Sequence, residues 1–277
     1  MSDVSVTYNG GGNVVANYSY DPLRYWPSDG ANHLLSFFAY YPAENGAITG
    51  KTVAGALNEY KYNFTVPSDA ANQVDFMISD VVKDQKYSIN NGVVPLVFHH
   101  MLTQVRFRVT LDKEYANTVI KIKGLQLTNI NSTGTLSVVA AADGTVKTNS
   151  IWSAQSTPVS FTVPVTETAL TYASPASYYE PSSPAATLLM LPQTIAVDDA
   201  STTSVDEAAK LVITYTYQTT PGMTTAIEDT KTVNLSKTEL LSWEKNNNIL
   251  YSITLGLNAI RFTATVSDWD AQKTVNL

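Results

Sequence analysis

One stretch near the middle of the chain alternates strictly between apolar and polar side chains. The apolar set is Val105, Phe107, Val109 and Leu111, and the polar set is Arg106, Arg108 and Thr110. Successive side chains of a strand face opposite sides of the sheet. The pattern therefore predicts a half-buried β-strand with a basic, solvent-facing outer side.

The same period of two recurs along the chain, which favours an all-β fold. Alternating segments cover residues 60–66, 120–127, 161–165, 211–217, 251–257 and 262–266. Turn-forming dipeptides such as Asn91-Gly92, Asp143-Gly144 and Pro221-Gly222 separate such segments. Many short strands with turns at this spacing predict antiparallel sandwiches rather than alternating βαβ units. Helical signals are confined to two short stretches, 205–210 and the capping-box sequence 236–239.

The length of 277 residues is enough for two domains, each with its own core. A polar stretch leads into residues 150–158, and a fresh strand pattern follows at 161–165. We therefore predict an N-terminal β-sandwich over residues 1–155 and a C-terminal β-sandwich over residues 156–277.

Composition excludes several classes of protein. Apolar residues make up 44% of the chain and charged residues 15%, which is not the composition of a disordered protein. The chain has no cysteine, so disulfides, thiolate metal sites and thiol catalysis are excluded. A net charge of −7 without any Lys/Arg cluster argues against nucleic acid as a partner. No apolar run reaches the length of a membrane span.

The residues that could carry chemistry do not form a catalytic or metal-binding pattern. His99 and His100 are adjacent, so on a strand they face opposite sides and cannot bind one metal ion. His33 is isolated, and neither a Gly-x-Ser-x-Gly nor a His-Glu-x-x-His motif is present. Carboxylate pairs such as Asp198-Asp199 and Asp268/Asp270 are interpreted as solvated loop acids. We expect no catalytic residues, metal or cofactor, and a protein that is not an enzyme.

Six segments, taken in order, resemble one known family. The most specific is 96–109, where Phe98, His100, Leu102, Val105, Phe107 and Val109 form a core-strand motif. The others are Trp26-Pro27 with 34–42, then 75–79, 188–193, 243–251 and 260–269. Together they resemble the fimbrillin family, the pilin-like surface proteins of Gram-negative anaerobes. Asn246-Asn247-Asn248 stands where that family usually has a Gly-Lys pair.

The resemblance implies a fimbrial (pilus) subunit or fimbrillin-like adhesin built from two transthyretin-like antiparallel β-sandwich domains in tandem. Such proteins are exported as lipoprotein precursors to the outer membrane, the cell surface or the fimbrium. The resemblance implies contact with the membrane only through a lipid anchor on the precursor. It also implies assembly with other pilin subunits, as homo- or heteropolymers, by donor-strand addition after an N-terminal strand is removed. His100 is then expected to have a packing and hydrogen-bonding role.

Two questions stay open at this stage. The first arginine, Arg24, already lies inside the expected first domain, so either processing occurs upstream of this sequence or this member is not processed at an arginine. The alternative function is a surface glycan-binding module that does not polymerise, with host or bacterial glycans or proteins as partners. The aromatic pairs Tyr25-Trp26, Tyr40-Tyr41 and Tyr178-Tyr179 motivate it, and Tyr178 and Tyr179 are the candidate exposed contact.

Overall fold

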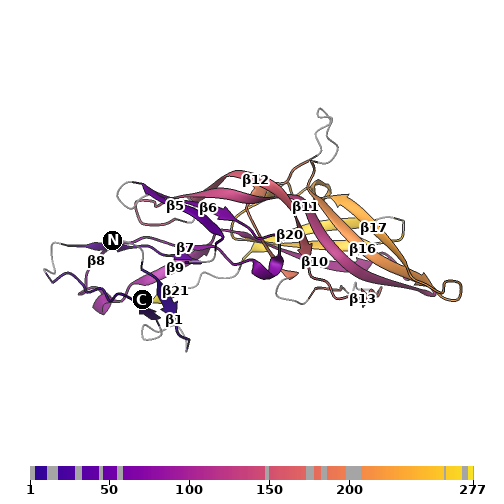
Figure 1. Ribbon diagram of the computed structural model, residues 1–277, viewed down its shortest axis with the longest axis horizontal. Helices are drawn as coiled ribbons and strands as arrows, with labels where there is room; N and C mark the ends of the chain where they lie inside the picture. Colours follow the sequence, from indigo (N-terminus) through magenta and orange to yellow (C-terminus); the bar gives the residue numbers. More distant parts are fainter. Residues whose placement is uncertain are drawn as a thin grey trace.

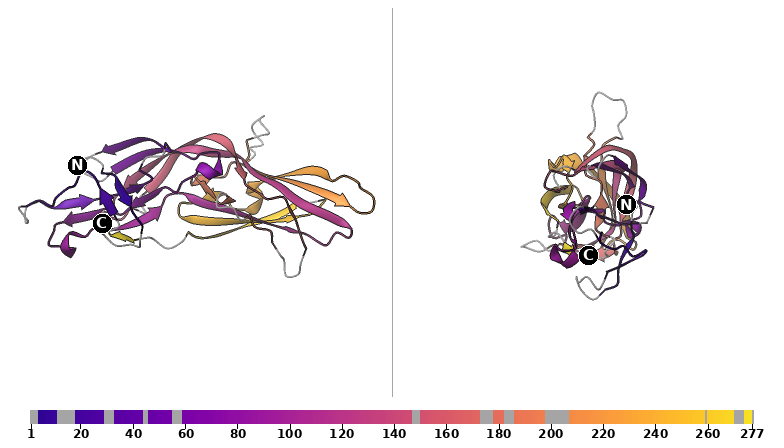
Figure 2. Two further views of the ribbon diagram at one scale, coloured as in Figure 1. Left: turned by 60° about the horizontal axis from the view of Figure 1, so that its bottom comes forward. Right: turned by 90° about the vertical axis from the view of Figure 1, so that its left-hand side faces the viewer.

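The computed structural model shows an elongated, all-β molecule (Figure 1 and Figure 2). It describes residues 4–10, 18–28, 33–43, 46–54, 59–146, 150–172, 178–181, 186–197, 207–258, 260–269 and 274–276. In these ranges helical structure is limited to 3-10 geometry, at Ala70–Asn72, Asn90–Gly92 and Leu235–Thr238 and at the single residue Ala186. No helix in the described ranges has the length and apolar character needed to cross a bilayer.

The largest sheet is organised by one long strand, β11 (Thr118–Val139), which runs along much of the molecule (Figure 1). Strand β12 (Ser150–Val163) pairs with β11 from Leu125 to Val138. Along its other edge β11 pairs first with β16 (Lys210–Thr219) and then with β6 (Glu59–Thr65). The outer strands are β17 (Ile227–Asn234) beyond β16, β5 (Ile48–Ala54) beyond β6, and the two-residue β13 (Thr168–Ala169) on β11.

A second sheet faces the first, in the order β14-β10-β19-β20. Its strands are β14 (Leu188–Met190), β10 (Thr103–Leu111), β19 (Asn247–Leu255) and β20 (Ile260–Asp268). Strands β10 and β19 run parallel from Gln104↔Asn248 to Leu111↔Leu255, so the expectation of purely antiparallel sheets is wrong at this pair. The alternation of apolar and polar residues in β10 and in β19 determines which face of each strand is buried. It does not determine whether two strands so far apart in the sequence pair in parallel or antiparallel.

A third group of short strands forms the left-hand end of the molecule in Figure 1. One sheet has the order β21-β9-β7-β4, made of Thr274–Asn276, Pro95–His100, Met77–Ser79 and Tyr40–Tyr41. Three small pairs complete the fold: β1 (Val6–Tyr8) with β2 (Tyr18–Tyr20), β3 (Leu35–Phe37) with β8 (Val82–Gln85), and β15 (Gln193–Thr194) with β18 (Ser242–Trp243).

The inward faces of these strands form one contiguous apolar core. Every other side chain of β6 and β10, and of β16 as far as Tyr215, is buried, as the alternation predicts. The largest fully buried side chains include Trp243, Tyr62, Tyr215 and Tyr251. Trp243 Nε1 donates to the hydroxyl of Tyr251 over 2.9 Å, and burial raises the pKa of that hydroxyl. By contrast, the buried hydroxyl of Tyr62 has no hydrogen-bond partner among the described residues.

The structure corrects two local expectations and leaves a third open. Thr110 was predicted on the solvent side of its strand, yet it is buried, because β10 lies inside the fold at its C-terminal end. Of the stretch 205–210, residues 205 and 206 lie outside the described residues, and Lys210 already begins β16. The predicted boundary after residue 155 falls within β12, and β10 from the first half pairs with β19 from the second. The division into two domains stays a prediction.

Candidate assembly site

The segment with the core-strand motif connects two sheets. Strand β9 ends at His100, Met101 and Leu102 are fully buried, and β10 begins at Thr103. The Met101 N–H donates to Phe76 O over 2.8 Å, while Leu102 O accepts from the Asn246 N–H over 2.9 Å. The junction is therefore tied to both neighbours, and its backbone is held in place at the point where the short-strand end meets the main sandwich.

The motif residues share one environment, with two exceptions. Leu102, Val105, Phe107 and Val109 are buried, and the rings of Phe107 and Tyr251 stack at 5.7 Å across the parallel pair. Phe98 and His100 are only half-buried, on β9. On the opposite side of β10, Arg106 Nε donates to Asn248 Oδ1 and Arg108 Nε donates to Ser252 Oγ. The two arginines thus fix the register of β10 against β19 rather than forming a free basic surface.

The two adjacent histidines face different partners. His100 Nδ1 lies 2.6 Å from Asp75 Oδ2, and its ring stacks on the indole of Trp269 with centroids 4.1 Å apart. His99 is buried, and its Nε2 lies 2.9 Å from Asp80 Oδ1 without the alignment of a good hydrogen bond. Sequence reasoning placed Asp75 and Trp269 in separate motif segments, and only the fold reveals that both contact His100.

A short strand closes the open edge of β9. Strand β21 pairs with β9 through three residue pairs, Thr274↔Val97, Val275↔Leu96 and Asn276↔Pro95, while β7 occupies the other edge. By comparison, β10 and β19 are joined over eight residue pairs. A strand held by so few main-chain hydrogen bonds is the easiest of these to replace with an incoming strand of the same direction.

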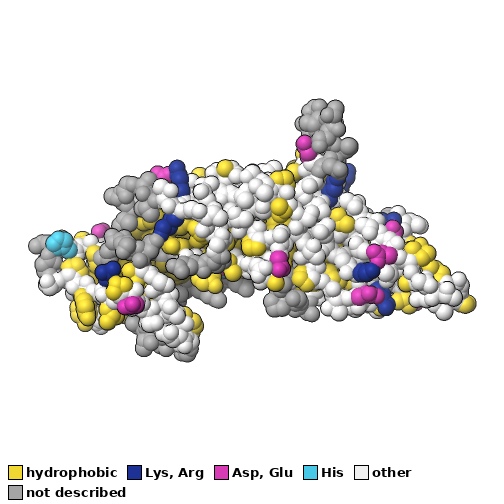
Figure 3. All heavy atoms as spheres, in the orientation of Figure 1, with side chains coloured by type: hydrophobic (Ala, Val, Ile, Leu, Met, Phe, Trp, Pro, Cys, Tyr) yellow, Lys and Arg dark blue, Asp and Glu magenta, His cyan; other side chains and the backbone are white. Residues whose placement is uncertain are grey.

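Other sheet edges carry features that resist such pairing. Edge strand β17 presents Glu228, Asp229 and Lys231, and charged side chains on an edge discourage addition of another strand. Figure 3 shows basic and acidic side chains next to each other at this right-hand end of the molecule. They include the ion pairs of Lys123 with Glu228 and of Lys231 with Asp229.

Tyr178 and Tyr179, predicted as an exposed contact, are both half-buried. Tyr179 exchanges two backbone hydrogen bonds with Val109, of 2.8 and 2.7 Å, and its hydroxyl donates to Thr166 O over 3.1 Å. The guanidinium of Arg108 lies 4.0 Å from the centre of the Tyr178 ring. Both rings are therefore engaged within the fold, because a β-bridge to β10 holds this segment against the sandwich.

Chemistry-bearing clusters are scarce in the described ranges. No three His, Asp or Glu side chains come together there in a way that could hold a metal ion. Asp198, Asp199 and Asp270 lie outside the described residues, and His33 lies far along the chain from the other two histidines. The most distinctive site is instead a sheet edge closed by a three-residue strand.

The fold is all-β, and a three-residue strand closes one of its sheet edges. The model of the family described as Fimbrillin-like matches residues 1–269, and the chain belongs to this family. It is thus a fimbrillin-like protein, as the ordered sequence segments indicate.

The chain is similar to solved structures, the first of which shares its fold. A fimbrial protein from Bacteroides vulgatus ATCC 8482 is 21% identical with a TM-score of 0.65, over 92% of this chain and 82% of that one. A protein from Bacteroides uniformis ATCC 8492, described as a cell adhesion protein, is 16% identical with a TM-score of 0.49, over 93% of this chain and 78% of that one. None of the curated proteins compared with the chain matches it.

Proposed function

We propose that this chain is a non-enzymatic, cell-surface fimbrial subunit that joins other pilin subunits by donor-strand addition. Its family membership over residues 1–269 supports a fimbrial or adhesive role. The observation that carries the assembly step is the edge of β9, which among the described residues is covered by the three-residue strand β21 alone. A strand from a neighbouring subunit gains more main-chain hydrogen bonds along the six residues of β9 than β21 makes.

The proposal includes export as a lipoprotein precursor and removal of an N-terminal strand before assembly. Strands β1 and β2 support this step, because they pair only with each other and their side chains are mostly exposed. The sequence alone argued against Arg24 as a processing site, but in the structure Arg24 follows these strands in an exposed stretch. Cleavage after Arg24 separates the β1–β2 pair from the rest of the chain without breaking a strand ladder of the main sheets.

Processing is tested by incubating the purified protein with an arginine-specific protease and following filament formation by negative-stain electron microscopy. We expect a single early cut after Arg24, followed by filaments. The Arg24→Gln variant is the matched control, since it keeps the fold and removes the site. Efficient cutting that leaves a strictly monomeric protein contradicts the proposed assembly.

The acceptor edge is tested with a covalent lock. Val97 and Thr274 are directly opposite in the antiparallel pair, where the Cα separation suits a disulfide. The chain has no other cysteine, so a Val97→Cys/Thr274→Cys protein forms one defined bridge. We expect the oxidised protein not to assemble, reduction to restore assembly, and Val97→Cys alone to behave as the parent. Filaments formed by the fully oxidised protein exclude β9 as the acceptor.

A further inference from the structure

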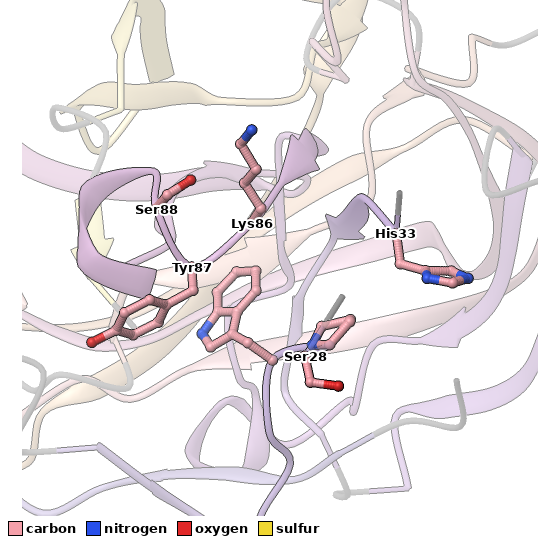
Figure 4. Close-up of a pocket in the computed structure, with 7 residues that line it drawn as sticks. Ser28, His33, Lys86, Tyr87 and Ser88 are labelled. Atoms are coloured by element: carbon pink, nitrogen blue, oxygen red, sulfur yellow. The ribbon is translucent and has the colours of Figure 1, made fainter. Parts of the chain in front are cut away.

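A pocket lies at the end of the molecule where Figure 1 labels β8, away from the main sandwich. It has a volume of about 360 Å³ and is lined by Trp26, Pro27, Ser28, His33, Lys86, Tyr87 and Ser88 (Figure 4). Pairing of β3 with β8, through Leu35↔Gln85, brings its two halves together. One half precedes β3 in the chain and the other follows β8. The volume falls at the small end of the roughly 300–1,000 Å³ range of ligand pockets.

Gly92 lies close to both aromatic rings of this pocket. Gly92 has a φ of +79°, and a Cβ there would lie 2.8 Å from Trp26 Nε1 and 2.9 Å from Tyr87 Cδ2. Both rings therefore approach the same point of backbone, which no larger residue allows. The turn is held by the Ile89 N–H donating to Lys86 O over 2.9 Å and the Gly92 N–H donating to Ile89 O over 3.0 Å. The two aromatic walls are thus positioned before any ligand arrives.

One aromatic ring of the pocket packs against the fold, and the other is largely exposed to solvent. Trp26 is half-buried, and its ring packs on Phe37 of β3 with centroids 5.6 Å apart and planes at 56°. Tyr87 is 62% exposed beside it. Large aromatic rings that are fixed on one side and open on the other suit a flat, partly apolar ligand such as the C–H face of a sugar ring.

The polar groups of the pocket are few and one of them is cationic. Lys86 is half-buried, and within the described part of the chain its ammonium has no carboxylate partner. Ser28 and Ser88 are exposed and lie on opposite sides of the aromatic rings (Figure 4). In a protein of net charge −7, a lysine that lines a pocket and has no carboxylate partner among the described residues marks a local preference for an anion.

We propose that this pocket binds a terminal sugar residue bearing a carboxylate, as in an acidic surface glycan. The sugar ring packs on Trp26 and Tyr87, and the flexible side chain of Lys86 receives the carboxylate. Tyr25-Trp26 is one of the three aromatic pairs that motivated a sugar platform in the sequence, and in this pocket Trp26 is paired with Tyr87 instead. Binding at this site is a property of the single subunit and does not depend on strand exchange.

The experiment measures binding of methyl β-D-glucuronide and methyl β-D-glucoside to the full, unprocessed chain by saturation-transfer NMR and titration. These two ligands differ only at the carboxylate. We expect a dissociation constant for the glucuronide on the order of 1 mM, as a ligand of this size allows, and binding of the glucoside at least ~10-fold weaker. Saturation is expected on the ring C–H protons that face the aromatic walls.

Three variants separate the parts of the site. Lys86→Gln should bring the glucuronide down to the affinity of the glucoside, whereas Tyr87→Ala should weaken both ligands at least ~10-fold. Lys113→Gln is the matched control, since Lys113 also lies over a tyrosine ring, that of Tyr115, but outside the pocket. Equal affinity of the parent for both ligands, no binding at high millimolar concentration, or an unchanged Lys86→Gln variant each overturns the proposal.

Discussion

The imidazole of His100 lies flat against the indole of Trp269, with ring centroids 4.1 Å apart and planes at 8°. The backbone N–H of Trp269 donates to Asn246 O over 2.8 Å. Strand β21, which pairs with β9, begins five residues after Trp269. His100 is itself the last residue of β9. The stack therefore ties the segment that leads to the closing strand to the strand that it closes.

We expect Trp269→Ala to loosen β21 before it affects the main sandwich. Loss of the stack should lower the free energy of unfolding by about 1–2 kcal/mol. It should raise amide hydrogen exchange on β9 more than on β10. Tyr25→Ala is the control, since Tyr25 is 86% exposed. Equal exchange of β9 amides in parent and variant contradicts this account of the stack.

Gly144→Ala should be one of the most damaging single substitutions in the chain. A Cβ at Gly144 would lie 2.1 Å from Val81 O, and the residue also has a φ of +97°. Gly46→Ala is a matched control, because Gly46 shares a positive φ of +75° but has nothing within 4 Å. Positive φ alone costs roughly 1–2 kcal/mol.

We therefore expect Gly144→Ala to lower the free energy of unfolding by at least about 2 kcal/mol more than Gly46→Ala. Urea denaturation of both variants measures the difference. Similar values for the two would mean that Val81 moves aside freely, despite the hydrogen bond from its N–H to Gly144 O.

The burial pattern of β10 can be predicted from the sequence, whereas the tertiary contact of Gly144 cannot. Alternation along β10 correctly predicts that Val105, Phe107 and Val109 are buried, because a period of two is a local property. Asp143-Gly144 is likewise predictable as a turn. That the turn touches Val81, some sixty residues earlier, depends on tertiary packing and leaves no local signal.

In the candidate site, too, local features could be predicted from the sequence and contacts between distant segments could not. His100 could be assigned a packing and hydrogen-bonding role from the sequence, but its partners Asp75 and Trp269 come from two segments that are distant in the sequence. Parallel pairing of β10 with β19 was not predictable, since each strand alone fits either direction. The pocket beside Trp26 was missed because Tyr87 has no aromatic neighbour in sequence, and only the β3–β8 pair brings the two rings together.

The core-strand motif predicts a graded response to truncation. Phe107→Ala removes a ring that is 3% exposed and stacked on Tyr251, so it should lower the free energy of unfolding by about 3–5 kcal/mol. Phe98 is half-buried on β9, and Phe98→Ala should cost about 1–2 kcal/mol. Thermal and chemical denaturation of both variants check the order. A reversed order would show that β9, not β10, carries the packing of this motif.

The hydrogen bond from the Tyr215 hydroxyl to Asp229 Oδ2, of 2.7 Å, predicts a pH-dependent contribution to stability. This bond, with that from the Thr230 N–H, holds the pKa of Asp229 below its ordinary value. A carboxylate with a lowered pKa stabilises the fold above its unfolded-state pKa, and this contribution is lost as the pH falls through the folded-state pKa. Tyr215→Phe should therefore lower the melting temperature clearly at about pH 7 and much less at about pH 2.5.

Tyr217→Phe is the control for this comparison, because Tyr217 lies on the same strand without a hydrogen-bonded carboxylate in the described ranges. Its effect on the melting temperature should be the same at both pH values. If Tyr215→Phe also shows no dependence on pH, the bond to Asp229 is not the source of the lowered pKa.

Two buried threonines on β10 predict opposite responses to the same substitution. Among the described residues the buried hydroxyl of Thr110 has no hydrogen-bond partner, whereas that of Thr103 donates to Glu244 O over 2.7 Å. Replacement by Val keeps the shape and removes the hydroxyl. Thr110→Val should therefore leave stability unchanged or raise it by up to about 1 kcal/mol, since it removes an unpaired polar group from the core. Thr103→Val should lower the free energy of unfolding by about 1–2 kcal/mol, because Glu244 O loses its donor.

Urea denaturation of the two variants measures this difference. A loss of stability in Thr110→Val comparable to that in Thr103→Val would show that the Thr110 hydroxyl has a partner in solution.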